Sequence, residues 1–296
     1  MKKLLFVFII ILSSFGCFKK DRNSNYNTYL FNQNIMFNDL LNNIPKTILI
    51  HGTLFPVFSN LTRTFDVPLG LHSACALSKH YGHGRVAHLL SDSCKYEFDL
   101  NYFYMFGWSG RLCFKYRKKA AMELYEYLKN INGPITLIGH SHGGNVALLL
   151  EEVAKEKCDY NFKIDRLILL ATPVQKATES YITSSIFKKV YALYSSGDFI
   201  QVLDPQGFYS KTKQVCRKND IKRIPWFSKR AFSSCHNLKQ AKILIDKRNP
   251  GHLDFILKSV LVRSIYKILN ILDQVDYRDT NIINITRHGS VNLISK

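Results

Sequence analysis

The sequence predicts an α/β fold in which helices cover both faces of a mainly parallel sheet of about six strands. Two observations predict it. Several short, continuous apolar runs are typical of strands that are buried on both faces. The longer segments between them carry apolar residues at the three-to-four spacing of an amphipathic helix. A chain of 296 residues with 46% hydrophobic content is long enough for one domain with a sizeable core.

The first half of the expected domain supplies three of the strands. Each is an apolar run rich in β-branched or aromatic residues, and each is followed closely by glycine, which is typical of a strand that ends at a turn. The strands expected here are 47–50, 102–106 and 134–138, and the helices are 71–90 and 115–130.

The second half continues the alternation and ends on a strongly amphipathic helix. Its expected strands are 165–170, 190–194 and 242–245, and its expected helices are 145–157 and 253–272. The carboxyl ends of parallel strands meet at one edge of a sheet, and reactive groups gather there. We therefore expect His51, Ser141 and Asp198, which all follow strands, to lie along one edge.

The sequence Gly-His-Ser-His-Gly-Gly at 139–144 lies between an expected strand and an expected helix. This context is typical of a serine at the apex of a sharp, strained turn, where the flanking glycines avoid a collision with the backbone. Such a turn aims the backbone N–H of His142 at the place where negative charge develops on a substrate carbonyl. Ser141 is therefore the predicted nucleophile, and the side chains of His140 and His142 are expected to shape the pocket.

A serine nucleophile needs an imidazole to take its proton and a carboxylate to orient that imidazole. Asp198 directly follows the strand 190–194 and is the predicted acid, with Asp204 as its competitor. His252 follows the last strand and opens the last helix, so it is the predicted base. Its rivals, His236 and His288, lack that position at a strand end.

From 44 to 272 the chain resembles the α/β-hydrolase superfamily, on the branch of lipase-like bacterial serine esterases. The resemblance implies a three-layer α/β-hydrolase fold, a Ser-Asp-His triad and no cofactor. It also implies a second oxyanion N–H from Thr53 or Leu54, while His51 itself is expected to be structural. Two strands that usually lead the fold are absent before Ile48. The matching pieces are the 139–144 motif, His-Gly at 51–52, Ser-Gly-Asp at 196–198 and Pro-Gly-His-Leu-Asp at 250–254.

The predicted reaction is the hydrolysis of carboxylic or lipid esters through an acyl-enzyme. A thioesterase or an acyltransferase could use the same three residues. A different class of function is a catalytically silent scaffold that binds a membrane or a partner protein. The intact set of Ser141, Asp198 and His252 favours the enzyme, because a scaffold has no need for all three.

A basic segment at 205–238 lies between the predicted acid and the predicted base. Its Pro-Trp-Phe sequence at 225–227 would suit a lid that meets a membrane, and the alternative is a solvated excursion. Cys216 and Cys235 bracket part of it and are the favoured disulfide pair. Six cysteines follow Cys17, and they allow fifteen connectivities, or several can be small buried hydrophobes. Metal-ligand spacings are absent from the sequence, so no metal is expected.

The N-terminus predicts export. Two lysines precede the apolar stretch 4–12, as in a signal peptide, and the segment ending at Cys17 resembles a bacterial lipobox in which this cysteine is lipidated. A membrane-anchored lipoprotein is expected, or else a periplasmic or secreted protein. The net charge of +19 would favour an anionic membrane surface, and nucleic acid is not an expected partner. The expected domains are a signal peptide at 1–17, a polar tether at 18–43, the hydrolase domain at 44–275 and a tail at 276–296.

Overall fold

The computed structural model describes residues 44–53, 67–80, 82–203, 228–275 and 281–294. The predicted signal peptide, Cys17, the tether, Leu54, Asp204 and Cys216 lie outside these ranges. Most of the basic segment at 205–238, including its Pro-Trp-Phe sequence, also lies outside them.

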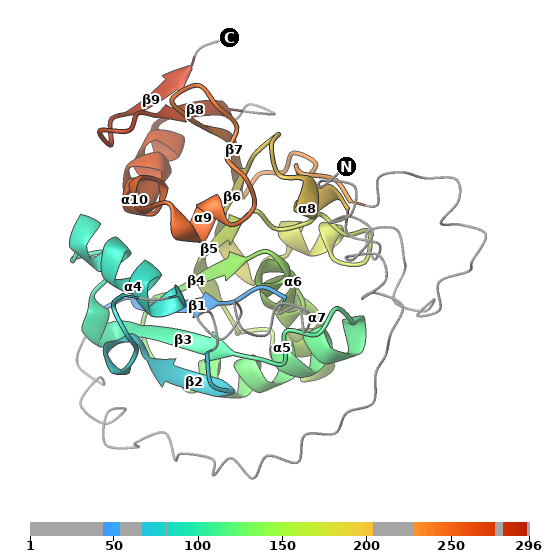
Figure 1. The fold of residues 1–296 in the computed structure, drawn as a ribbon. Coiled ribbons are helices and arrows are strands. Elements are labelled where there is room, and N and C mark those ends of the chain that lie inside the picture. Colours follow the sequence, from blue (N-terminus) through green and yellow to red (C-terminus); the bar gives the residue numbers. More distant parts are fainter. Residues whose placement is uncertain (1–43, 54–66, 81, 204–227, 276–280, 295–296) are drawn as a thin grey trace.

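The described residues build one sheet of nine strands in the order β2-β3-β1-β4-β5-β6-β7-β8-β9 (Figure 1). Every neighbouring pair from β3 to β8 is parallel, and the two outermost pairs are antiparallel. The predicted fold class, a mainly parallel sheet covered by helices, is confirmed. The strands are β1 Lys46–Ile50, β2 Gly70–Ser73, β3 Phe103–Gly107, β4 Ile135–His140, β5 Ile164–Leu170, β6 Phe187–Tyr194, β7 Leu238–Ile245, β8 Asn281–Ile285 and β9 Val291–Ile294.

The predicted number of about six strands is too low. All six predicted runs are strands, and the sheet gains β2 at one edge and β8 and β9 at the other. Gly70, with a φ of 95°, begins the short β2 strand, which runs back along β3 in a segment predicted to be helical. The segment predicted to be a tail supplies β8 and β9, and Ile283 and Ile285 of β8 are fully buried. The run Asn-Ile-Ile-Asn-Ile at 281–285 is too short to give a clear strand signal in the sequence.

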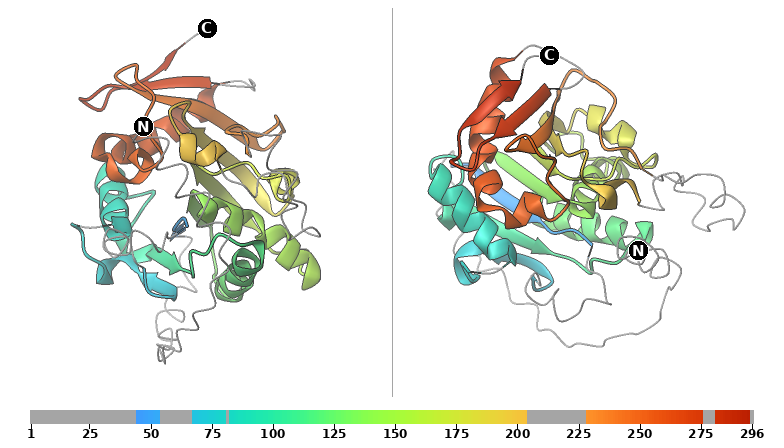
Figure 2. Two further views of the ribbon diagram at one scale, coloured as in Figure 1. Left: turned by 45° about the vertical axis from the view of Figure 1, so that its right-hand side comes forward. Right: turned by 45° about the horizontal axis from the view of Figure 1, so that its top comes forward.

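Helices pack on both faces of the sheet, which gives three layers (Figure 2). Successive strand residues serve opposite faces, as the side-chain alternation of a strand requires. Ile48 of β1 packs in a cluster with α5, α6 and α7, whereas Leu49 packs in a cluster with α4 and α10. The helices are α4 Gly82–Ser93, α5 Phe114–Leu128, α6 His142–Leu148, α7 Leu150–Glu156, α8 Phe199–Val202, α9 Asp254–Leu257 and α10 Ser259–Gln274.

Three predicted helices differ from their expected bounds. The helix expected at 145–157 begins earlier, at His142, and is divided at Leu149 into α6 and α7. The helix expected at 71–90 is confined to α4. Gly84 lies inside this helix, and the position requires glycine because a Cβ there would lie 2.5 Å from the carbonyl oxygen of Ser78. The helix expected at 253–272 is divided into α9 and α10, because Lys258 has the extended backbone of a strand. None of the helices in the described ranges is long and apolar enough to cross a bilayer.

Candidate functional site

Ser141 lies in the turn between β4 and α6, and its backbone is strained. Its φ of 53° and ψ of −129° belong to a region that side-chain-bearing residues rarely adopt. Such a conformation costs on the order of 1–3 kcal/mol and persists only where the surroundings hold it. Here the N–H of Ser141 donates to the carbonyl of Leu170 at 2.9 Å, and the N–H of Gly144 donates to the carbonyl of Ser141 at 3.1 Å.

The glycines around Ser141 allow the backbone segments to approach closely. A Cβ at Gly139 would lie 2.5 Å from the Cα of Gly144. A Cβ at Gly143 would lie 2.3 Å from the carbonyl oxygen of Ile50 at the end of β1. Both distances are below any real Cβ contact, so larger residues would push α6 away from the two strands. The glycine pattern that predicted a tight turn therefore has a steric basis.

Asp198 and His252 meet although they are far apart in the sequence. Asp198 Oδ2 lies 2.7 Å from His252 Nδ1, and the carboxylate is fully buried. The other oxygen, Oδ1, accepts the backbone N–H of Gln201 at 2.9 Å. A carboxylate held in this way accepts the Nδ1 proton and leaves Nε2 of His252 as the proton acceptor.

The loops that carry Asp198 and His252 come together at Gly197. A Cβ at Gly197 would lie 2.8 Å from the carbonyl oxygen of Asn249 and 3.0 Å from that of Pro250. The sequence context that singled out Asp198, a Ser-Gly-Asp after a strand, therefore contains the residue that permits this approach. On the outer side, Arg230 Nε donates to the carbonyl of Asp198 at 3.1 Å.

The competing histidines lie elsewhere. His288 is exposed between β8 and β9, with its Nε2 3.2 Å from Nε of Arg287. His236 is also exposed, in the loop before β7. Among the described residues, neither has a buried carboxylate partner like the one that Asp198 gives to His252.

The turn after β1 lies directly against Ser141. A Cβ on Gly52 would lie 2.8 Å from the Cβ of Ser141. Thr53, one of the two residues predicted to supply an oxyanion donor, follows this glycine, and its Oγ1 is buried without a hydrogen bond to any described residue. His142, the other described donor candidate, is the buried first residue of α6.

A contact between His51 and Trp108 holds this turn, and the sequence did not reveal it. The Nδ1 of His51 donates to the carbonyl of Gly52 at 2.7 Å, and its Nε2 accepts the backbone N–H of Trp108 at 3.0 Å. In return, Nε1 of Trp108 donates to the carbonyl of His51 at 2.8 Å, and the two rings stack at 5.7 Å. In the sequence, only the Gly-Trp-Ser-Gly segment at 107–110, at the end of β3, marks this region, and it does not indicate His51 as the partner.

Three buried histidines surround the turn without carrying charge near neutral pH. Burial lowers the pKa of His51 to about 4. Burial also holds the pKa of His140 well below its usual value, with smaller effects from His252, His83 and His51. The pKa of His142 is held well below its usual value by burial and then by the positive charge of Arg117. The predicted structural role of His51 is consistent with this neutral, doubly hydrogen-bonded ring.

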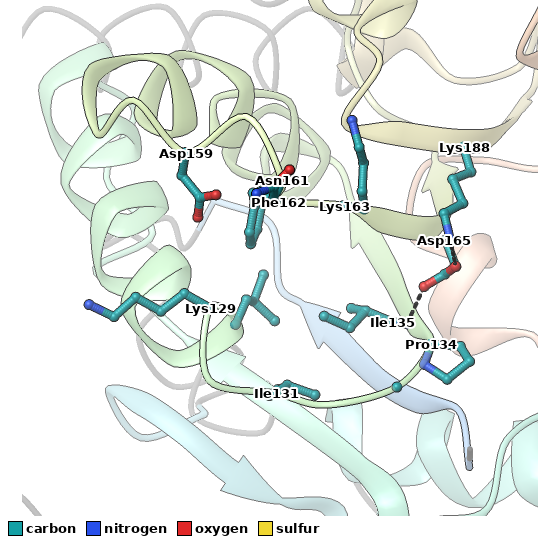
Figure 3. A pocket seen from close by; sticks show the side chains of 12 residues that line it. Lys129, Ile131, Pro134, Ile135, Asp159, Asn161, Phe162, Lys163, Asp165 and Lys188 are labelled. Carbon is teal, nitrogen blue, oxygen red and sulfur yellow. Dashed lines mark hydrogen bonds and ion pairs between the residues drawn. The ribbon is translucent and has the colours of Figure 1, made fainter.

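A cavity of about 480 Å³ lies far from Ser141, at the amino ends of the central strands (Figure 3). Its charged groups are already paired: Lys188 Nζ lies 2.5 Å from Asp165, and the same carboxylate accepts the N–H of Ile135 at 2.9 Å. Because it opens at the edge of the sheet opposite to Ser141, this cavity is not a candidate substrate site.

The described cysteines form no disulfide with one another; they are Cys75, Cys94, Cys113, Cys158 and Cys235. The favoured partner of Cys235 lies outside the described ranges, so that pairing stays a prediction. In the described ranges, no group of three or more His, Cys, Asp or Glu side chains could hold a metal ion.

No family model and no curated protein matches the chain. Among solved structures, it is similar to an esterase from the hyperthermophilic archaeon Pyrobaculum calidifontis (11% identity, TM-score 0.33, covering 83% of this chain and 68% of that one). It is also similar to a putative hydrolase from Agrobacterium vitis S4 (12% identity, TM-score 0.38, covering 77% of this chain and 87% of that one). A third similar structure is a lipase-esterase related protein from Clostridium acetobutylicum ATCC 824 (11% identity, TM-score 0.34, covering 77% of this chain and 96% of that one).

Proposed function

We propose that this protein is a serine hydrolase of the α/β-hydrolase type that cleaves carboxylic esters through an acyl-enzyme. The observation that carries the proposal is the buried 2.7 Å contact between Asp198 and His252, at the same edge of the sheet as the strained Ser141. Nucleophilic acyl transfer requires a buried acid that orients an imidazole and a serine held in a strained turn within reach of that imidazole.

In the proposed reaction, Ser141 Oγ attacks the ester carbonyl while Nε2 of His252 takes the hydroxyl proton. Asp198 holds the imidazole in the correct tautomer and stabilises the imidazolium that forms. His252 then gives the proton to the leaving alcohol, and an acyl group stays on Ser141. Water, activated by the same imidazole, releases the acid and restores the serine.

The negative charge on the tetrahedral intermediate needs backbone donors. The N–H of His142 at the start of α6 is the first proposed donor, and an N–H of Thr53 or Leu54 is the second. The 2.8 Å approach of a Gly52 Cβ to Ser141 Cβ supports the second assignment, since it places the turn after β1 beside the reacting atom.

Two exposed apolar residues support an apolar acyl or lipid ester as the substrate. Phe199 is 56% exposed and directly follows Asp198, and Leu253 is 45% exposed and directly follows His252. Because Asp198 and His252 are in contact, these two exposed apolar residues are chain neighbours of residues in the proposed site. Large exposed apolar groups beside a site are typical of surfaces that bind apolar ligands.

Export and membrane anchoring at Cys17 are part of the proposal and rest on the sequence. The +19 net charge would add an attraction to anionic lipid. We expect the protein in the membrane fraction, and Cys17→Ser to move it into the soluble fraction. Unchanged fractionation of that variant would contradict lipidation.

The function is tested with p-nitrophenyl esters of increasing acyl length. The wild type should hydrolyse them, and Ser141→Ala should lose the activity while it keeps its circular dichroism spectrum. Thioester and acyl-acceptor substrates run in parallel separate an esterase from a thioesterase or an acyltransferase. A folded wild type that acts on none of these substrates would contradict the proposal.

A further inference from the structure

His140 lies between the two loops that the proposed mechanism uses. It is the buried last residue of β4, immediately before Ser141. Its ring packs against the ring of His252, with the centroids 4.9 Å apart and the planes inclined by 47°. Its Nε2 lies 3.3 Å from the carbonyl oxygen of His252. A carbonyl oxygen only accepts, so Nε2 of His140 carries the proton and donates it.

The opposite side of the His140 ring lies beside the turn after β1. A Cβ on Gly52 would be 3.3 Å from Nδ1 of His140 and 3.2 Å from its carbonyl oxygen. The ring therefore fills the space between the loop that carries His252 and the turn that carries the proposed oxyanion donor. A change in its shape or hydrogen bonding would be felt on both sides.

The surroundings keep this ring neutral. Burial is the main reason that its pKa lies well below the usual value, and the neighbouring imidazoles of His252, His83 and His51 lower the pKa further. A neutral imidazole has one proton, and the geometry assigns that proton to Nε2. The ring is thus a fixed donor toward the His252 main chain and has no proton to exchange with Ser141.

We propose that His140 is a positioning residue that fixes the main chain of His252 and, through it, the direction of the imidazole toward Ser141. This inference rests on the proposed function. The sequence motif assigned His140 only a place in the wall of the pocket. The contact with the His252 carbonyl gives it a defined task, which is to donate one hydrogen bond to the residue that moves the proton.

Two substitutions separate the donor from the ring. His140→Phe keeps an aromatic ring but removes the donor, and His140→Gln replaces the ring but can place an amide N–H at the same point. Without this donor the main chain of His252 is held less firmly, and the resulting misplacement of the imidazole should slow the reaction about tenfold or more. We expect that loss in kcat of the phenylalanine variant with KM little changed, and recovery of most of it in the glutamine variant.

The same substitution in a His252→Ala background distinguishes positioning from general structural support. The main-chain carbonyl of residue 252 remains in that background, so any effect of His140→Phe on folding persists. The effect on the residual rate should disappear, because no imidazole is left to be positioned. Circular dichroism and thermal unfolding check folding, and His140→Leu replaces the phenylalanine variant if that variant does not fold.

Three results would overturn the inference. They are an unchanged kcat in the folded phenylalanine variant, a glutamine variant as slow as that variant, and an equal loss with and without His252. Each requires an active wild type, which separates them from failure of the proposed function. A folded wild type that neither hydrolyses esters nor reacts with a fluorophosphonate would overturn both.

Discussion

Replacing Gly197 by alanine should separate the loop of Asp198 from the loop of His252. The new Cβ would lie 2.8 Å from the carbonyl oxygen of Asn249, whereas ordinary contacts begin at 3.4 Å, so the loops must part by the difference, 0.6 Å. If the Asp198 to His252 contact lengthens from 2.7 Å by that amount, it reaches 3.3 Å, just beyond the usual range of such hydrogen bonds. A misplacement approaching 1 Å in an active site can cost about 10²-fold in rate.

Gly251 offers a matched control in the same loop as His252. A Cβ there would have its nearest neighbour at 3.8 Å, an oxygen of Asp254, which is an ordinary contact. We expect Gly251→Ala to hydrolyse p-nitrophenyl esters nearly as fast as the wild type and Gly197→Ala to be about 10²-fold slower in kcat. Equal rates for the two variants, both folded by circular dichroism, would refute the steric reasoning.

Three further predictions concern the turn after β1. Gly52→Ala should slow ester hydrolysis and fluorophosphonate labelling, because its Cβ would lie 2.8 Å from Cβ of Ser141; undiminished labelling would contradict that packing. Trp108→Phe removes the indole N–H that donates to the buried carbonyl of His51 at 2.8 Å. The free energy of unfolding in urea should fall by about 1–3 kcal/mol, and an unchanged value would count against the contact. His51 has a pKa of 6.5 when unfolded and about 4 when folded, so folding favours its neutral form. This contribution to the free energy of unfolding is fully present above pH 6.5, and up to about 3 kcal/mol of it is lost as the pH falls toward 4. The unfolding free energy of the wild type should therefore drop more than that of His51→Gln over this range, and parallel curves would refute the assignment.

Local sequence signals predicted the parts of the fold that depend on local sequence. The apolar runs of the six central strands and the Gly-x-Ser-x-Gly turn each carry their own signature, because burial on both faces and a strained turn both restrict the residue types. Asp198 and His252 were singled out by their positions after strands, which parallel strands bring together, and by the serine-acid-histidine order that the resemblance implies.

What the sequence could not predict depends on contacts between distant segments. Edge strand β2 and strands β8 and β9 are short and take their stability from pairing with strands already in the sheet. The contact between His51 and Trp108 joins residues 57 apart, and the contact between His140 and His252 joins residues 112 apart. A single histidine in a sequence does not indicate which carbonyl its ring will meet.

The central claim is that Ser141 is an activated nucleophile, and covalent labelling tests it most directly. The folded wild type is treated with a fluorophosphonate, digested, and analysed by mass spectrometry. The account predicts one phosphonyl adduct, on Ser141, with a labelling rate that falls sharply in His252→Ala and no adduct in Ser141→Ala. An unlabelled wild type, or an adduct on another residue that persists in Ser141→Ala, would contradict it.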